Sequence, residues 1–149
     1  MAEAPRKHAA IVSVDIAGFS ALAERDAAEA LAHVARVRTY AAGIAAKHNG
    51  RIFNTAGDGL MLEFASAADA LHAAIALCEV EKEAKLRLGV HLGEVTETPS
   101  GDLLGHAVNV AARLQAEATS GTILVSQIIY ASADPALAAR LQSRGKIKL

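Results

Sequence analysis

The stretch RIFNTAGDGLMLEF, residues 51–64, contains two short apolar runs joined by a glycine-rich connection. RIFNT and LMLEF have the apolar and aromatic content of strands, and AGDG supplies the residue types that tight turns prefer. A β-hairpin is therefore predicted, with Asp58 at its tip. Aspartate and glycine are also ordinary turn formers. The hairpin alone leaves open whether Asp58 has a chemical role.

On either side of the hairpin, the apolar periodicity alternates between that of strands and that of helices. HAAIVSVDIAG, residues 8–18, is a β-branched apolar run typical of a buried central strand. Two predicted helices begin with capping signatures, in which Asp26 precedes Glu29 and Ser66 precedes Asp69 by three residues. Helices are predicted over residues 26–49, 66–82 and 105–119, and strands over residues 8–18, 51–55, 60–64, 86–95 and 121–126. The pattern after residue 134 is ambiguous.

This order of elements predicts an α+β fold, a ferredoxin-like sandwich in which helices cover one face of a largely antiparallel sheet. The chain has 149 residues, of which 52% are hydrophobic, and this fits a single domain spanning residues 1–149. Residues 1–8 are expected to be a flexible N-terminal segment.

Composition restricts the partners and the compartment. Fifteen basic and sixteen acidic side chains give a formal net charge of −1, so no broad field attracts nucleic acid or lipid. No apolar run is long enough to span a membrane, and no membrane contact is expected for this segment. The single cysteine, Cys78, excludes an internal disulfide and fits a reducing compartment, so we expect a cytoplasmic protein.

Two carboxylates are expected to meet at one end of the sheet. Asp15 ends the first predicted strand and Asp58 lies at the hairpin tip, so pairing of these strands would bring the side chains together. Mg²⁺ is typically held by one or two carboxylates plus substrate phosphates, and two ions about 3.5–4 Å apart clamp in-line phosphoryl transfer. IAGFS, residues 16–20, makes a glycine-containing turn into a helix, whose backbone N–H groups suit a phosphate chain. Each aspartate taken alone is more commonly a cap or turn residue.

Asn109 and Arg113 lie four residues apart on the predicted helix 105–119 and therefore share one face. Without other context, such a pair is most often part of a solvated polar stripe. The six histidines show no metal-ligand spacing. Asn109 and Arg113 indicate a function only when they are considered together with the other segments of the chain.

Four segments in the same order resemble the class III nucleotide cyclase catalytic domain, the adenylate and guanylate cyclase homology domain. They are VDIAGFS (residues 14–20), NTAGDGLMLEF (54–64), LRLGVHLGEV (86–95) and, most specific, GDLLGHAVNVAARL (101–114). The resemblance runs from about Ile11 to Leu149. It implies an α+β sandwich and a homodimer whose shared active sites lie in the subunit interface.

The resemblance assigns Asp15 and Asp58 to the two metal-binding aspartates of that family. It implies two divalent cations, Mg²⁺ or Mn²⁺, as cofactors. The turn that follows Asp15 is similar to the family's loop whose backbone holds the β- and γ-phosphates of a nucleoside triphosphate. In this chain that loop consists of Ile16, Ala17, Gly18 and Phe19.

On the helix, Asn109 matches the family's ribose-orienting asparagine, and Arg113 matches the arginine that stabilises charge at the α-phosphorus. The family places these two residues on one subunit and the metal-binding aspartates on the other. A homodimer would then contain two equivalent sites. The implied reaction is in-line attack of the ribose 3′-oxygen on the α-phosphorus, assisted by two metals.

Base choice in the family depends on two positions, a lysine with an aspartate in the case of adenine. Asp102 matches the aspartate and could accept a hydrogen bond from the adenine 6-amino group, which favours ATP. Asn54 stands at the lysine position, and its amide can offer an acceptor as well as a donor. The family usually has a phosphate-binding lysine in its final strand, and Lys146 and Lys148 are out of register with it.

The sequence thus predicts an adenylate cyclase that converts ATP to 3′,5′-cyclic AMP and pyrophosphate. Asn54 at the lysine position also supports a cyclase with relaxed choice between ATP and GTP. Asn54 and the missing phosphate-binding lysine together support a degenerate cyclase-like module that dimerises and binds nucleotide. A third alternative is a diguanylate cyclase, whose Gly-Gly-Asp/Glu-Glu-Phe hallmark superficially resembles GDGLMLEF. The helix VNVAAR, residues 108–113, argues against it.

Overall fold

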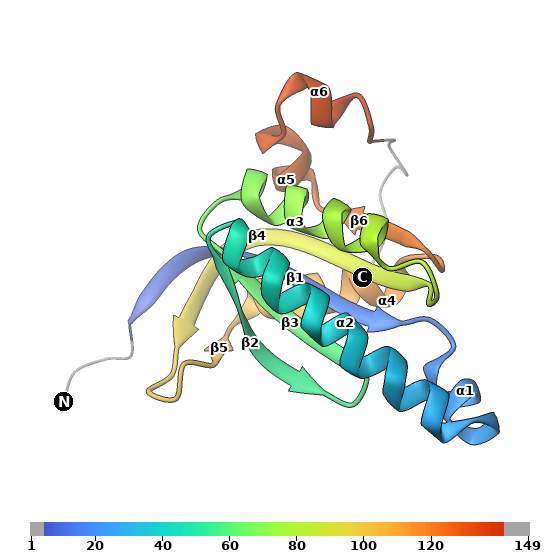
Figure 1. The fold of residues 1–149 in the computed structure, drawn as a ribbon. Helices are drawn as coiled ribbons and strands as arrows, with labels where there is room; N and C mark the ends of the chain where they lie inside the picture. The colour runs from blue at the N-terminus through green and yellow to red at the C-terminus, as the bar shows by residue number, and fades with distance from the viewer. Residues whose placement is uncertain (1–4, 142–149) are drawn as a thin grey trace.

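The computed structural model describes residues 5–141. Strands and helices alternate along most of the chain (Figure 1). The strands are β1 (Arg6–Ile16), β2 (Gly50–Ala56), β3 (Gly59–Phe64), β4 (Leu86–Glu97), β5 (Leu103–Leu104) and β6 (Thr122–Val125). The helices are α1 (Phe19–Arg25), α2 (Ala27–Lys47), α3 (Ala67–Val80), α4 (His106–Glu117), α5 (Gln127–Ser132) and α6 (Pro135–Ala138).

The strands form one six-stranded sheet in the order β2-β3-β1-β4-β5, with β6 paired to β4 away from this path. The β4–β6 pairing is parallel, and the other pairings are antiparallel. The predicted α+β class and largely antiparallel sheet are therefore confirmed. The long pairing of β1 with β4 sets Asp15 opposite Arg87.

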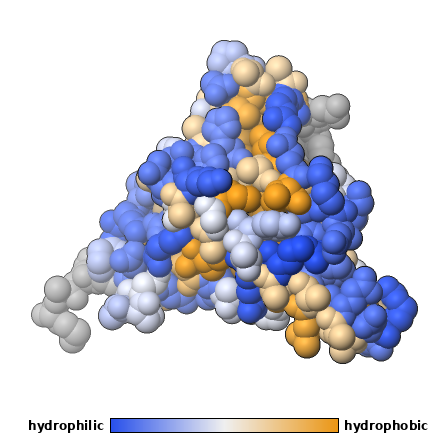
Figure 2. All heavy atoms as spheres, viewed as in Figure 1, coloured by the Kyte–Doolittle hydropathy of each residue, from blue (hydrophilic) through white to orange (hydrophobic). Residues whose placement is uncertain are grey.

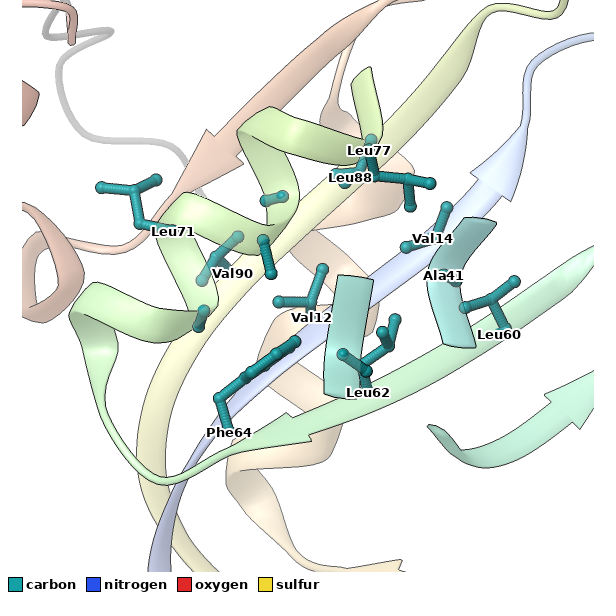
Figure 3. Packing of buried hydrophobic residues seen from close by; sticks show 14 of the residues in the cluster. Val12, Val14, Ala41, Leu60, Leu62, Phe64, Leu71, Leu77, Leu88 and Val90 are labelled. Carbon is teal, nitrogen blue, oxygen red and sulfur yellow. The ribbon is translucent and has the colours of Figure 1, made fainter. Parts of the chain in front are cut away.

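The central strand β1 is buried on both faces, as its continuous apolar run predicts. Val12 and Val14 belong to the larger core cluster, in which they pack with residues of α2 and α3 (Figure 3). Ile11 belongs to a second cluster, formed with Ala107 and Ala111 of α4. Alternate residues of a strand point to opposite faces, so α4 covers the face opposite to α2 and α3.

The expectation that helices cover only one face is therefore wrong. Periodicity shows that a helix has an apolar stripe, but it does not show which face of a sheet receives that stripe. The close approach of α4 depends on Gly89 of β4. A Cβ atom there would overlap the Ala111 carbonyl oxygen and the Gln115 backbone nitrogen, and would lie 2.9 Å from the Leu114 Cβ.

The ends of several elements follow the sequence signals. The Asp26 carboxylate accepts a hydrogen bond from the Glu29 N–H, and the Ser66 hydroxyl accepts one from the Asp69 N–H, so both predicted caps are confirmed. Of residues 1–8, which are expected to be flexible, residues 6–8 belong to β1 and pair with β4. Residues 1–4 lie outside the described part of the chain.

Hydrophilic residues dominate the face that carries α2 and α3, and hydrophobic residues gather over the α5 region (Figure 2). Ile128 and Tyr130 of α5 are exposed. Across residues 5–141, none of the helices combines the length and apolar character that crossing a membrane requires.

Candidate active site

The structure brings Asp15 and Asp58 to the same end of the sheet. Asp15 is the penultimate residue of β1, and Asp58 lies in the turn between β2 and β3. The Asp58 Oδ2 accepts a hydrogen bond from the backbone N–H of Ile16 at 2.9 Å, so the hairpin tip is attached to the end of β1. This hydrogen bond holds Asp58 next to the residue that follows Asp15, at the end of the sheet where the two carboxylates were expected to lie close together.

Arg87 is a third charged residue at this place, and no sequence motif indicated that it belongs to the site. Its Nε donates to Asp15 Oδ1 at 2.9 Å and its Nη2 to Asp15 Oδ2 at 2.5 Å. The hydrogen bonds that Arg87 donates to Asp15 raise the pKa of Arg87, and the charges of Asp15 and Asp58 act in the same direction while burial opposes them. Polar and apolar residues alternate at the start of segment 86–95, where Arg87 lies between Leu86 and Leu88, but only the strand register shows that Arg87 faces Asp15.

The carboxylates of Asp15 and Asp58 are suited to bind a divalent cation that also coordinates phosphate oxygens. The Asp15 side chain is 17% exposed, and the second oxygen of Asp58 accepts no hydrogen bond from residues 5–141. Within that range, no three or more His, Cys, Asp or Glu side chains group to hold a metal ion. Two carboxylates leave coordination positions for phosphate oxygens and water, which is how Mg²⁺ is usually bound. Asp15 and Asp58 are thus suitable ligands for Mg²⁺ or Mn²⁺.

The loop after Asp15 has fewer free donors than the sequence suggested. The Ile16 N–H donates to Asp58, and the Ala17 N–H donates to the Lys85 carbonyl oxygen at 2.9 Å. Gly18 has a φ of 70° and precedes α1, which begins at Phe19. The N–H groups of Gly18 and Phe19 have no acceptor among residues 5–141. They are the part of this loop that remains able to donate to an anion.

The structure places Asn54 and Asp102 in contact. The Asn54 Nδ2 donates to the two Asp102 carboxylate oxygens at 3.4 and 3.3 Å. A β-bulge in β2 lies between Ile52 and Asn54, and bulges re-aim the side chains that follow them. Phe53 packs in the cluster on the α4 side of the sheet, so the bulge allows Asn54 to reach the same side.

Asn109 and Arg113 lie on α4, and both are exposed. Within residues 5–141, neither side chain forms a hydrogen bond or an ion pair with another residue. The structure therefore does not connect them to Asp15 or Asp58 within one chain. Lys146 and Lys148 lie outside the described residues.

A further contact, which no sequence motif predicts, supports the hairpin tip from α2. Arg38 Nη2 donates to the Gly57 carbonyl oxygen at 2.9 Å, immediately before Asp58. Arg38 lies next to the apolar stripe of α2, and this position could have indicated that its guanidinium points toward the sheet. The acceptor is a backbone oxygen in a distant turn, which no pattern of side chains identifies.

Comparisons with known proteins point to one family. The family described as the adenylate and guanylate cyclase catalytic domain matches residues 1–149. The chain is 38% identical over 138 residues to "Putative adenylate cyclase 3" of Rhizobium meliloti, a match that covers 84% of this chain and 23% of that protein. It is 33% identical over 121 residues to an adenylate cyclase of Streptomyces coelicolor, covering 78% of this chain and 32% of that protein. The chain thus spans between 23% and 32% of the length of these curated relatives.

The fold has a counterpart among solved structures. The crystal structure of the adenylyl cyclase CyaB from P. aeruginosa matches with a TM-score of 0.80 and 23% sequence identity. The match covers 99% of this chain and 90% of that chain. At this level of identity, the likeness establishes the fold alone.

Proposed function

Because the chain belongs to the adenylate and guanylate cyclase catalytic domain family, we propose that it is an adenylate cyclase domain that forms 3′,5′-cyclic AMP and pyrophosphate from ATP. The observation that carries the proposal is the hydrogen bond from the Ile16 N–H to Asp58, which sets two carboxylates at the end of adjacent strands. The names of the relatives support adenylate over guanylate cyclase activity.

Asp15 and Asp58 would hold two divalent cations, Mg²⁺ or Mn²⁺. When bound, the cations would lower the pKa of the ribose 3′-hydroxyl and offset charge on the pyrophosphate that leaves. Arg87 keeps the Asp15 carboxylate oriented through two hydrogen bonds. The chain supplies position and charge, and the reaction needs no covalent enzyme intermediate.

The turn after β1 would receive the triphosphate. The N–H groups of Gly18 and Phe19 would donate to phosphate oxygens, while those of Ile16 and Ala17 keep the turn in shape through their own acceptors. Backbone donors that are held in place before the substrate arrives do not have to reorganise during the reaction.

Asn54 and Asp102 would select the base. Asp102 would accept from the adenine 6-amino group, where guanine presents an acceptor oxygen. The Asn54 Nδ2 carries two hydrogens, so it can donate to Asp102 and to adenine N1 together. This arrangement favours ATP without a lysine.

Asn109 and Arg113 would act on a nucleotide bound by a second copy of the chain. Both are exposed on α4, which fits residues that complete a site across an interface. In the resulting homodimer, Asn109 would orient the ribose and Arg113 would stabilise negative charge at the α-phosphorus. The 3′-oxygen forms a bond to that phosphorus, the bond to the β-phosphate oxygen breaks, and the hydroxyl proton is lost to water.

Incubation of the protein with ATP or GTP and Mn²⁺, followed by mass identification of the product, tests the proposal. Cyclic AMP from ATP, formed faster than cyclic GMP from GTP, is the expected result. Absence of either product at dimer-forming concentrations, from protein that is shown to be folded, would contradict it.

Asn54 stands at a position where the resemblance leads us to expect lysine, so two other functions are also compatible with this chain. Comparable rates with ATP and GTP would identify a cyclase with relaxed base choice. Nucleotide binding and dimerisation without product would identify a degenerate regulatory module. The presence of Asp15, Asp58, Asn109 and Arg113 together favours catalysis, because a module that only binds does not require all four.

A further inference from the structure

We propose that Arg51 is a positioning residue that sets base selectivity by holding the loop of residues 98–102 against β2. The inference rests on the proposed function, in which Asp102 and Asn54 recognise the base. Asn54 lies on β2, and Asp102 lies in the loop between β4 and β5. The position of Asn54 relative to Asp102 decides whether both side chains can form hydrogen bonds to the same nucleotide base.

These two elements lie at opposite ends of the sheet order. Strand β2 pairs with β3, and β5 pairs with β4, so no backbone ladder joins β2 to β5 within the described part of the chain. Side chains supply the connection instead. They lie on the α4 side of the sheet, because Glu63 is paired with Ile11, which contributes to the core on that side.

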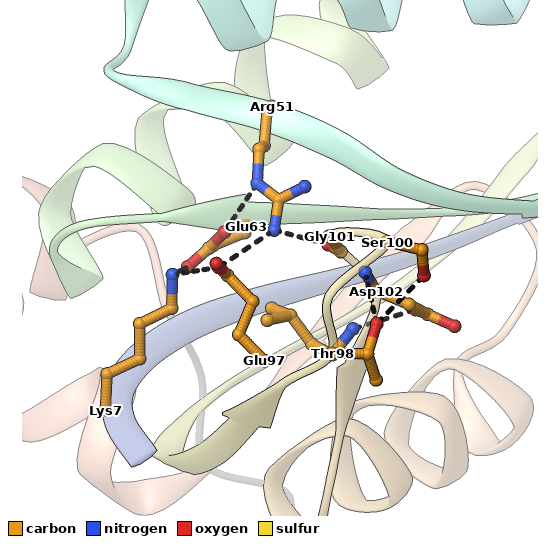
Figure 4. A network of polar contacts seen from close by, with 9 residues as sticks. Lys7, Arg51, Glu63, Glu97, Thr98, Ser100, Gly101 and Asp102 are labelled. Atoms are coloured by element: carbon orange, nitrogen blue, oxygen red, sulfur yellow. Dashed lines mark hydrogen bonds and ion pairs between the residues drawn. The ribbon is translucent and has the colours of Figure 1, made fainter. Parts of the chain in front are cut away.

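Arg51 makes the central part of this connection (Figure 4). Its Nε donates to Glu63 Oε1 at 2.8 Å, and its Nη2 donates to the Gly101 carbonyl oxygen at 2.6 Å. The same Nη2 lies 3.4 Å from Glu97 Oε1. The planar guanidinium can hold a carboxylate and a backbone oxygen in fixed directions at once, which a lysine ammonium cannot do in the same geometry.

The acceptor on the loop is the residue immediately before Asp102. Gly101 has a φ of 90°, a conformation that favours glycine. Thr98 stabilises the turn internally: its N–H donates to the Asp102 carbonyl oxygen at 2.9 Å, and its hydroxyl accepts from the Asp102 N–H at 3.1 Å. The loop is therefore a preformed unit, and the bond from Arg51 determines where the unit sits relative to β2.

The remaining attachment of the loop is weak. Strand β5 has two residues, and the pairing of β4 with β5 comprises two partner positions, Thr96 with Leu104 and Glu97 with Leu103. The direct contact between Asn54 and Asp102 is long, at 3.3 and 3.4 Å. The contact from Arg51 to Gly101 is the shortest bond from β2 to this loop.

Lys7 offers a matched control within the same group of charges. Its Nζ donates to Glu97 at 2.7 Å and lies 2.7 Å from Glu63, but it contacts no residue of the loop. A Lys7→Gln change therefore disturbs the ionic group without removing the bond to Gly101. Arg51→Lys retains the positive charge and removes the two-directional donor.

The test measures loop order and selectivity separately. Hydrogen exchange of the amides of residues 100–103 is compared for wild type, Arg51→Lys and Lys7→Gln, and the kcat/KM ratio for ATP over GTP is measured for each. We expect Arg51→Lys to speed exchange and to lower the ratio about fivefold, the effect of one lost hydrogen bond. Lys7→Gln should leave both quantities at wild-type values.

Unchanged exchange in Arg51→Lys would overturn the inference, and so would faster exchange with an unchanged ratio, because Arg51 would then be merely structural. Equal effects of the two variants would also overturn it. If wild type forms no cyclic nucleotide, the proposed function fails on its own account. The ratio of Kd values for ATP and GTP then replaces the kinetic ratio, and the same outcomes decide the role of Arg51.

Discussion

Asp58 combines a structural contact with a proposed chemical one, and substitution can separate them. Asp58→Asn retains an oxygen that accepts from the Ile16 N–H but removes the charge. We expect metal-dependent turnover to fall by about 10²–10³, as for the loss of one catalytic electrostatic group. The free energy of unfolding should stay near that of wild type, as measured by urea denaturation.

Asp58→Ala is the informative companion, because it also removes the acceptor. It should lower the free energy of unfolding by about 1 kcal/mol in addition to the loss of turnover. Turnover of Asp58→Asn within tenfold of wild type would show that Asp58 is only a turn residue.

Asn54 is the second residue whose role can be tested alone. Asn54→Lys would place an ammonium beside the Asp102 carboxylate and a fixed donor beside adenine N1, while disfavouring the protonated N1 of guanine. A mismatched hydrogen bond in a closed pocket costs about 1–3 kcal/mol, so the kcat/KM ratio of ATP over GTP should rise about tenfold. A ratio that does not change would show that residue 54 does not contact the base.

At the scale of residues, the sequence identified the candidates that lie near a turn or a strand end and missed those that act over long separations. Asp15 and Asp58 could be paired in advance because both end elements of the same predicted sheet. The contact of Arg87 with Asp15 spans 72 positions, and that of Arg51 with Gly101 spans 50. Such contacts depend on strand register and sheet curvature, which local patterns do not determine.

At the scale of elements, Gly89 controls how closely α4 approaches the sheet. A methyl group there would overlap backbone atoms of α4, which cannot move independently of the helix. We expect Gly89→Ala to lower the free energy of unfolding by about 1–3 kcal/mol. It should also lower turnover at temperatures where the variant is folded, because α4 carries Asn109 and Arg113.

Gly43 in α2 provides the control, since a Cβ added there would lie within 4 Å of no atom other than those of its chain neighbours and the adjacent backbone of its own helix. Gly43→Ala should raise the free energy of unfolding by about 0.5–1 kcal/mol through helix propensity. Thermal unfolding and product formation measured on both variants distinguish the two positions. A Gly89→Ala protein with wild-type stability and turnover would contradict the close packing of α4.

Glu81 joins α2 to the connection between α3 and β4. Its side chain is fully buried and accepts from the Arg36 guanidinium and from the N–H groups of Glu83 and Ala84. The hydrogen bonds from Arg36 hold the pKa of Glu81 below its ordinary value of 4.5, although burial acts in the opposite direction. A lowered folded-state pKa means that this stabilisation is present above about pH 4.5 and is lost as the pH falls through the folded-state pKa.

Glu81→Gln should therefore lower the free energy of unfolding at pH 7 by about 2–3 kcal/mol, and the difference from wild type should shrink below pH 4.5. Urea denaturation at pH 7 and pH 4 measures both effects. Glu83→Gln is the matched control, because Glu83 pairs with the same arginine from a position that is 69% exposed. A control that loses as much stability as Glu81→Gln would contradict the role assigned to burial.

Elements with a clear period were predictable, and elements without one were not. The hairpin, the two capped helices and the buried strand follow from local patterns. Strand β5 has two residues and α6 has four, too few for a period to be visible. The placement of α4 on the opposite face of the sheet depends on tertiary packing around Gly89.

At the scale of the whole molecule, the proposed sharing of sites predicts complementation. Asp58→Asn and Arg113→Ala should each be inactive as homodimers, because each lacks a group in both sites. A heterodimer of the two restores one complete site, so an equal mixture should regain about a quarter of wild-type activity. Both substitutions lie at turn or surface positions and should leave the fold intact.

The measurement is product formation after the two variants are mixed, with heterodimers verified by distinguishable tags. Activity should appear only on mixing and should reach its maximum near equal proportions. Verified heterodimers without activity would contradict the interface site. Near-wild-type activity of either variant alone would show that its substituted residue is not required for turnover.

The separation of Asp102 from the central strand has an evolutionary consequence. Asp15 lies on β1, buried between two layers of helices, where substitutions disturb packing. Asn54 and Asp102 lie at the margins of the sheet and are held by side chains, so exchanges there cost little stability, within about 0.5 kcal/mol for typical surface changes. On the proposed function, a lineage with this architecture can acquire a new nucleotide preference by drift at two or three peripheral positions. Duplicated genes could then diverge into producers of different cyclic nucleotides while inheriting the same chemistry.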